Sequence, residues 1–283
     1  MELYHSIIGL PFSGKTTFLA ALWHMIEAGE VETKFVLDHL EGDQRYLNQI
    51  ATAWRECKPV TRTSMGAETN VKIHARLVKH DQKVVLNFPD LSGESFERQF
   101  VLRQARNDYV DGFSKEGGIL LFISANKPTD GLTIADLGPE LLDAPDGGVA
   151  QGTADASVEW KHEMVPQQAQ LVDLLQILQS APFFTRRRKL AVLVSAWDVV
   201  SDEDLLPDEW LSREVPLLHQ FLTHNPDAFD FQVWGVSAQG GDITGDKRQR
   251  LLSLMPSERV RCLGAGISGS DLTVPISWLS EAS

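Results

Sequence analysis

One short segment constrains this chain more than any other: Gly9-Leu10-Pro11-Phe12-Ser13-Gly14-Lys15-Thr16-Thr17. Four residues separate the two glycines, and the second glycine is followed by Lys and Thr. This is the complete spacing of a phosphate-binding P-loop. The apolar residues 6–8 precede the segment, and apolar residues recur at helical spacing over 18–26. The segment is therefore expected to join a buried strand to a helix, which is the setting that phosphate binding requires.

The residue types of this loop indicate how it would hold a nucleoside triphosphate. Gly9 and Gly14 let backbone N–H groups approach phosphate oxygens, and the first turn of the helix adds unpaired donors and the positive end of its dipole. Lys15 is expected to reach the β- and γ-phosphates, and the Thr16 hydroxyl is expected to bind Mg²⁺. Phosphate contacts or local caps are expected from two further residues, Ser13 and Thr17. The alternative is a glycine turn that caps an ordinary helix.

Composition limits the class of protein and its partners. The 283 residues are 43% hydrophobic and 8% aromatic, which suffices for a globular core, and the net charge of −13 argues against a nucleic-acid or anionic-membrane surface. Cys57 and Cys262 lack metal-ligand spacing, so we expect free thiols rather than a disulfide framework or a zinc site. Because the sequence has no signal-peptide pattern and no apolar run of membrane-spanning length, it predicts a cytoplasmic protein without a membrane span.

Strands alternate with helices along the chain, which predicts an α/β fold: a three-layer P-loop fold with a mainly parallel sheet and helices on both faces. Strands are expected at 6–8, 70–79, 84–88, 118–124, 190–194 and 231–236, the second and third forming an antiparallel pair. Helices are expected at 18–26, 43–57, 98–109, 165–179 and 210–222, and residues 274–279 are expected to pack back onto the body. The Gly-, Asp- and Pro-rich segment at about 126–159 is interpreted as an insertion, with short helical pieces at 134–142, in a single domain of residues 1–283.

Three further motifs follow apolar runs, where an open α/β sheet binds its ligands. Asp90-Leu91-Ser92-Gly93-Glu94 offers a carboxylate that can hold Mg²⁺ through water and a glycine that allows close approach to the γ-phosphate. Ser195-Ala196-Trp197-Asp198 ends in a carboxylate that can accept two hydrogen bonds from guanine, a pairing that adenine does not offer. In Ser237-Ala238-Gln239, the backbone N–H of Ala238 can donate to the guanine carbonyl.

The order of these motifs over roughly residues 4–240 resembles that of the TRAFAC-class P-loop GTPases. The chain length, the Asp-Leu-Ser-Gly-Glu motif, the Ser-x-x-Asp base motif and a tryptophan near the C-terminus resemble the bacterial double-GTPase family. Members of that family are associated with conflict-system operons and are suggested to work with a partner GTPase. The resemblance implies binding of GTP and GDP with Mg²⁺, hydrolysis of GTP and a switch action on a protein partner.

The resemblance also implies residue roles. Lys15 and Thr16 would bind phosphate and Mg²⁺, and Thr61 or Thr63 would be the switch threonine that closes on Mg²⁺. Asp90 and Gly93 would sense Mg²⁺ and the γ-phosphate. The guanine base would be selected and supported by Asp198, Ser237 and Ala238.

Two departures from the family pattern bear on activity. The lysine whose stem normally lies along the base is replaced by Ala196, so Trp197 or another side chain is expected to stack in its place. Glu94 stands where many members have a water-orienting Gln, and it is a candidate general base with Lys15 and Thr63 as the other candidate catalytic residues. Slow or partner-dependent turnover is therefore expected. A catalytically weak scaffold that assembles with a partner, and an ATPase, stay open as alternatives.

Two groups of basic residues are further candidates for contact with phosphate, and the second group is also a candidate for contact with an acidic partner. Arg98, Arg103 and Arg106 follow the Asp-x-x-Gly motif, and the dense run 186–189 precedes an expected strand. A solvated face or strand entry is the more common role of such residues.

Overall fold

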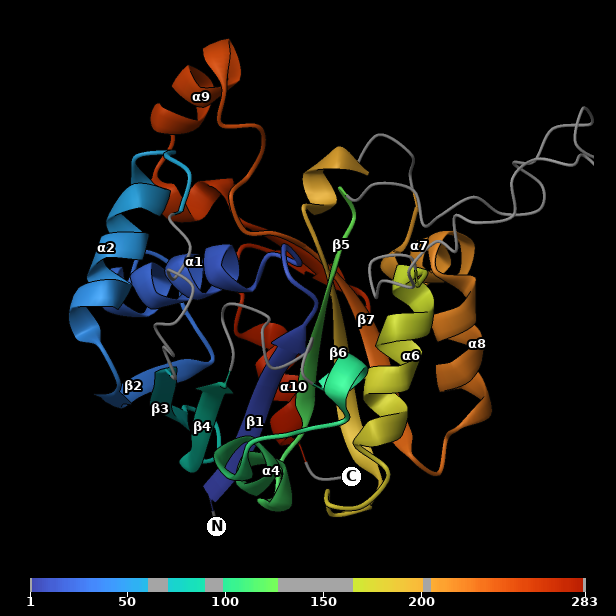
Figure 1. Ribbon diagram of the computed structural model, residues 1–283. Helices are drawn as coiled ribbons and strands as arrows, with labels where there is room; N and C mark the ends of the chain where they lie inside the picture. Colours follow the sequence, from blue (N-terminus) through green and yellow to red (C-terminus); the bar gives the residue numbers. More distant parts are fainter. Residues whose placement is uncertain (1, 61–70, 90–98, 127–164, 201–204, 282–283) are drawn as a thin grey trace, which may run out of the picture.

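The computed structural model describes residues 2–60, 71–89, 99–126, 165–200 and 205–281. The helical pieces expected within 134–142 lie outside these residues. A nine-stranded sheet, in the order β2-β3-β4-β1-β5-β6-β7-β8-β9, forms the centre of the described structure (Figure 1).

The middle of the sheet is parallel and its edges are antiparallel. The parallel strands are β4 (Gln82–Phe88), β1 (Glu2–Gly9), β5 (Ile119–Ser124), β6 (Arg188–Ser195) and β7 (Phe229–Ser237). One edge is extended by β3 (Val71–Leu77) and β2 (Phe35–Glu41), and the other by β8 (Arg261–Gly264) and β9 (Ile267–Gly269). The expected antiparallel pair is β3 with β4, so the mainly parallel sheet and its one predicted hairpin are confirmed.

Helices cover both faces of this sheet (Figure 1). One face packs against α1 (Lys15–Ala28), α2 (Gln44–Arg55) and α10 (Val274–Ser280). The other packs against α4 (Asn107–Ser114), α6 (Gln167–Ile177), α7 (Pro207–Glu214) and α8 (Pro216–His224). Along β5, Leu120 and Phe122 join the first core, whereas Leu121 and Ile123 join the second, because successive side chains of a strand point to opposite faces. The predicted three-layer α/β fold is confirmed.

Two predicted helices differ from the structure. The helix expected over 210–222 is divided into α7 and α8, because Val215 has non-helical backbone angles and Pro216 begins a new helix. The other difference precedes α4. Residues 99–102 are helical, but the helix expected over 98–109 is interrupted before α4 begins at Asn107. Arg103 has a φ of 53°, a left-handed conformation that a continuous helix does not allow. Its guanidinium instead donates to Asp173 of α6 at 2.6 Å, so a tertiary ion pair accompanies the break.

The first strand and the last helix are joined through the buried His5. The Gly118 N–H donates to His5 Nδ1 at 2.9 Å, so the neutral imidazole carries its proton on Nε2 and donates to Ser280 Oγ, also at 2.9 Å. Burial lowers the pKa of His5 from 6.5 to about 3, because the charged ring would lose its hydration. This pair of contacts confirms that the C-terminal segment packs back onto the body.

We predict that acidification destabilises the protein through His5. In the unfolded chain the pKa is 6.5, so below that pH the unfolded state binds more protons than the folded state, whose pKa is about 3. Neutral His5 contributes its full stabilisation above pH 6.5, the pKa of this residue in the unfolded chain. Below that pH the contribution decreases, by at most about 1.4 kcal/mol for each unit by which the pH is lowered. Urea unfolding of His5→Gln should show lower stability near pH 7 but a smaller loss between about pH 7 and about pH 5 than the wild type. Equal losses would contradict this role.

Candidate functional site

The carboxyl ends of neighbouring parallel strands bring three motifs together. Gly9 at the end of β1 is paired with Phe122 of β5, Ser124 of β5 with Ser195 of β6, and Ser195 with Val236 of β7. The P-loop, the Ser-Ala-Trp-Asp motif and the Ser-Ala-Gln motif thus meet at one edge of the sheet, although they are distant in the sequence. This is the edge at which open α/β sheets bind ligands.

Both P-loop glycines lie where a side chain does not fit. Gly14 has a φ of 91°, and a Cβ atom built there would lie 2.7 Å from Ser195 Oγ. Gly9 has a φ of 152°, and a Cβ atom there would lie 2.6 Å from the carbonyl oxygen of Phe122. Glycine is therefore required at both positions, by backbone conformation and by close approach to the adjacent strands.

Lys15 lies at the centre of the loop with only 4% of its surface exposed. Its ammonium donates to the carbonyl oxygens of Gly9 at 2.7 Å and Leu10 at 2.9 Å, so the loop curls around the charge. The half-buried Thr16 and Thr17 follow in the first turn of α1, where unpaired N–H groups and the helix dipole favour an anion. This cradle fits the phosphates of a nucleotide.

A cavity of about 500 Å³ extends from the P-loop along the ends of β5, β6 and β7. Gly14 and Thr17 line it beside α1, and Asp198 and Ala238 line it beside β6 and β7. Its volume lies in the range of pockets for small molecules. The structure therefore places the predicted phosphate-binding loop and the predicted base-reading residues on one cavity.

Ser237 positions the carboxylate of Asp198 in this cavity. The Ser237 hydroxyl donates to Asp198 Oδ1 at 2.5 Å and accepts a hydrogen bond from the Gly240 N–H at 3.2 Å. On the neighbouring residue, the carbonyl of Ala238 accepts from Trp54 Nε1 at 2.9 Å. Hydrogen bonds within the protein thus orient both predicted base-binding residues.

Two further residues of this edge were not predicted from the sequence. The Ser195 hydroxyl donates to the Ser13 carbonyl at 2.9 Å and so ties the base motif to the P-loop. Its only sequence signal is its position at the start of the base motif. Phe12 is 79% exposed, has a φ of 64°, and borders both the main cavity and a smaller one of about 360 Å³. A left-handed backbone is uncommon for an aromatic residue and indicates a constrained loop.

Trp197 does not line the cavity, so the hypothesis that it stacks on a ligand is wrong. Its side chain is 5% exposed and packs over Gly235, where a Cβ atom would come within 2.4 Å of the indole. It also makes an edge-to-face contact with Trp210 of α7, with ring centroids 6.3 Å apart. The left-handed Ala196 begins the short helix η2 (Trp197–Val199), and Trp197 joins the core between the sheet and α7.

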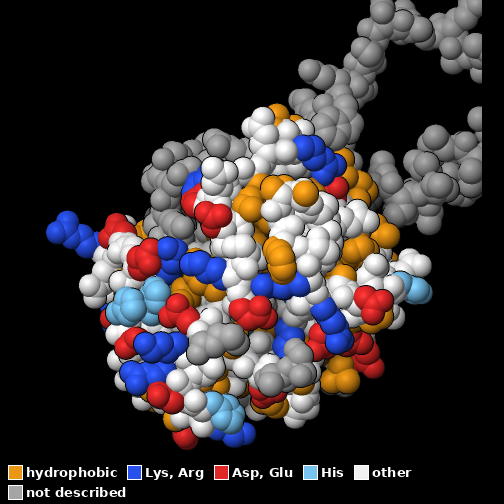
Figure 2. Space-filling view, turned by 90° about the horizontal axis from the view of Figure 1, so that it is seen from below, with side chains coloured by type: hydrophobic (Ala, Val, Ile, Leu, Met, Phe, Trp, Pro, Cys, Tyr) orange, Lys and Arg blue, Asp and Glu red, His pale blue; other side chains and the backbone are white. Residues whose placement is uncertain are grey.

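The candidate basic residues that the structure describes have structural partners. Arg188 begins β6 and Ser195 ends it, so roughly 23 Å separate the basic run from the P-loop edge. Arg188 is buried and donates to the Phe113 carbonyl at 3.1 Å. Figure 2 shows the face at the opposite end of the molecule from the cavity, where Lys and Arg are interspersed with Asp and Glu. Arg106 is paired with Asp108, and Arg98 lies outside the described residues.

Five predicted site residues lie outside the described part of the chain: Thr61, Thr63, Asp90, Gly93 and Glu94. Their roles stay predictions. Within the described part, no cluster of three or more His, Cys, Asp or Glu side chains is arranged to hold a metal ion. Of the expected Mg²⁺ ligands, only Thr16 is described, and it lies next to Lys15 at the start of α1.

The fold and this edge of the sheet define a P-loop nucleotide-binding protein of the α/β class. The sequence model of the Double-GTPase 1 family matches residues 6–279, and the chain belongs to this family. It is accordingly a GTP-binding domain, and the resemblance inferred from the motif order is confirmed.

Solved structures similar to this chain include GTPase domains. The GTP-bound Ski7 GTPase-like domain of S. cerevisiae is 13% identical, with a TM-score of 0.42 over 87% of this chain and 45% of that one. The G domain of the T. maritima FeoB iron transporter is 10% identical, with a TM-score of 0.31 over 89% of this chain and 98% of that one. This chain thus spans less than half of the Ski7 chain. No curated protein matches it.

Among the described residues, no helix is both long enough and apolar enough to cross a lipid bilayer.

We predict that removal of the Ser237 hydroxyl weakens guanine nucleotide binding, because Asp198 loses the donor that orients it. Ser237→Ala should raise the Kd for GDP about fivefold, the value of a typical single hydrogen bond. Isothermal titration calorimetry measures this change. Ser253→Ala, which removes an exposed hydroxyl that donates to the Arg250 carbonyl at 2.7 Å, is the matched control. Unchanged GDP affinity in Ser237→Ala would contradict the positioning role.

Proposed function

We propose that this protein binds GTP with Mg²⁺ in the cytoplasm, hydrolyses it to GDP and acts as a nucleotide-dependent switch on a protein partner. The observation that carries the proposal is the single cavity that joins the P-loop to Asp198. One nucleotide can therefore place its phosphates at the start of α1 and its base at the ends of β6 and β7. Membership in the Double-GTPase 1 family supports the same ligand.

The proposed choice of guanine rests on the donor and acceptor pattern of Asp198. A carboxylate accepts hydrogen bonds only, and guanine presents N1–H and its 2-amino group side by side on one edge. Adenine has no such pair of donors. Because Ser237 already orients the carboxylate, little ordering is needed when the base binds.

The proposed reaction is in-line attack of water on the γ-phosphate. Lys15 and the P-loop N–H groups would stabilise the charge that develops on the phosphate oxygens. Thr16, with Asp90 and either Thr61 or Thr63, would hold the Mg²⁺ that neutralises the phosphates. Glu94 is the proposed general base, and Gly93 would contact the γ-phosphate through its N–H.

Loss of the γ-phosphate would release residues 61–63 and 90–98, and that change would be the signal to the partner.

A nucleotide-binding scaffold with weak turnover is the second candidate. The observation that favours it is Ala196, which stands in the base motif in place of the usual lysine, while Trp197 is buried in the core. In this alternative the protein assembles with its partner, for which a second GTPase is the candidate that the family resemblance suggests. An ATPase is the third candidate, and it requires that Asp198 does not read the base.

We predict that Asp198→Asn moves base preference from guanine to xanthine. An amide in place of the carboxylate can donate to the 2-carbonyl of xanthine, whereas it cannot accept both guanine donors. Titration of the wild type and the variant with GDP, XDP and ADP in Mg²⁺ measures the preference. Equal binding of ADP and GDP by the wild type would favour the ATPase, and no binding of any of them would exclude a nucleotide-binding role.

We predict that Lys15→Ala abolishes release of phosphate from GTP, because the variant lacks the cation that contacts the phosphates. Single-turnover hydrolysis, measured with and without a candidate partner, compares the wild type with this variant. A rate for the wild type that never exceeds that of Lys15→Ala would contradict the GTPase and favour the scaffold.

A further inference from the structure

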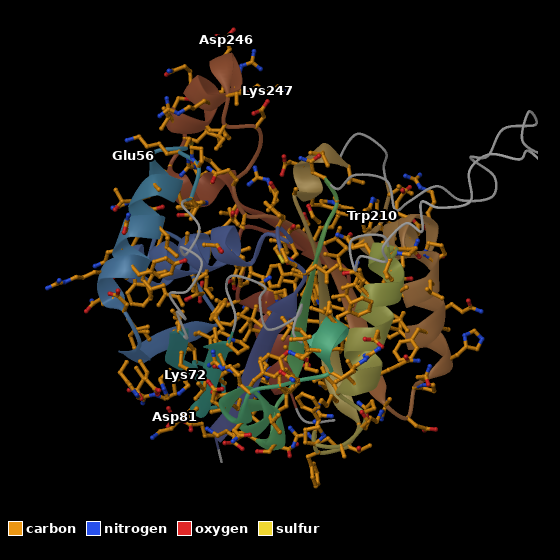
Figure 3. All side chains as sticks on the ribbon, in the orientation of Figure 1. Glu56, Lys72, Asp81, Trp210, Asp246 and Lys247 are labelled. Atoms are coloured by element: carbon orange, nitrogen blue, oxygen red, sulfur yellow. The ribbon has the colours of Figure 1, made fainter. Side chains whose placement is uncertain are left out.

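One wall of the nucleotide cavity is formed by a segment that the sequence motifs do not include. After Gln239 the chain continues through Gly241 and Asp242 into α9 (Gly245–Leu252), and Asp242 and Lys247 both line the cavity. Among the described lining residues, Lys247 is the only cation. Figure 3 shows Lys247 on the side of α9 that faces the ends of β5 and β6, with Asp246 at the tip of the helix.

The backbone of α9 is fixed by contacts on the other side of the helix. Arg248 donates to the carbonyl of Cys57 at 3.0 Å and to that of Glu56 at 2.9 Å, which joins α9 to the end of α2. Leu251 is buried against the body. Because these neighbours hold the helix against α2, the position from which Lys247 leaves the backbone is set by the fold.

The Lys247 side chain itself is available to a ligand. It is 73% exposed, and its ammonium lies 3.8 Å from Asp242 Oδ2, a loose ion pair at the edge of the cavity. Asp242 accepts hydrogen bonds from the N–H and hydroxyl of Thr244, at 3.0 and 2.8 Å. Asp242 is thus oriented by the turn before α9 and keeps the ammonium at the rim.

The Ser-Ala-Trp-Asp motif itself supplies no side chain to cover one face of a guanine bound to Asp198. Ala196 is too short to cover the ring, and Trp197 is packed against Gly235 and Trp210. A lysine can lay its methylene stem along an apolar or aromatic surface while its ammonium stays in water. Lys247 has the length and the cavity-facing position for this contact.

We propose that Lys247 is a specificity-determining residue that covers the base and ribose end of the bound nucleotide with its stem, held there by Asp242. The assignment rests on the proposed binding of a guanine nucleotide in this cavity. It places the cover of the base on a helix that follows the Ser-Ala-Gln motif, rather than within the Ser-Ala-Trp-Asp motif. The fold thereby supplies from α9 the side chain that the base motif lacks.

Three variants and two ligands test this assignment by calorimetry. Lys247→Ala should raise the Kd for GDP about tenfold, the scale of a stem or cation contact with an aromatic ring. Lys247→Met keeps an unbranched stem without the charge and should stay within about threefold of the wild type. Arg250→Ala removes a basic side chain of the same helix that does not line the cavity, and it should bind GDP as the wild type does. Pyrophosphate, which has no base or ribose, should bind equally to all four proteins.

Each other outcome overturns a defined part of the inference. GDP binding by Lys247→Ala at the wild-type affinity would show that Lys247 does not cover the nucleotide. Equal weakening of GDP and pyrophosphate would assign Lys247 to the phosphates, and a Met variant as weak as the Ala variant would assign the effect to charge. Failure of the wild type to bind GDP would instead refute the proposed function, so the two failures are distinguishable. Urea unfolding of each variant checks that it is folded.

Discussion

The close approach of the P-loop to the end of β6 is the contact on which the site depends. Gly14 lies against Ser195 without room for a Cβ atom, and the Ser195 hydroxyl donates to the Ser13 carbonyl at 2.9 Å. This contact sets the separation between the phosphate cradle and Asp198, which lies three residues beyond Ser195. In the proposed binding mode a nucleotide spans that separation, so the sheet register that pairs β5 with β1 and β6 would define the length of the ligand that fits.

A second set of contacts joins the end of α2 to the segment after β7. Trp54 donates to the Ala238 carbonyl, and the guanidinium of Arg259 lies 4.8 Å from the centre of the Trp54 ring. Arg259 also donates to Cys57 Sγ, and burial lowers the pKa of this arginine. These buried polar contacts hold the loop after β7 against α2. The far side of the cavity is thus built by segments that lie outside the recognised motifs.

Local patterns made much of the architecture predictable. The strands of the sheet centre are continuous apolar runs because they are buried on both faces, and the P-loop is recognised because its chemistry needs fixed residue types at fixed spacing. The edge strand β2 was missed, since four of its seven residues are exposed and its apolar pattern is weak. The helix α9 was missed because it buries little more than Leu251 and is held by arginine contacts to backbone carbonyls.

The sequence by itself determined the fold class, the phosphate-binding loop and the family, because each depends on short segments whose chemistry is read without knowledge of their neighbours. Tertiary structure alone decided which side chains line the cavity. Tryptophan is a residue type that stacks on nucleotide bases. The indole of Trp197 nevertheless packs in the core, because Gly235 has no side chain in the space that the indole fills. Lys247 has no motif around it, yet the anchoring of α9 to α2 brings it to the cavity. Both outcomes depend on the packing of segments that are distant in sequence, which no local pattern records.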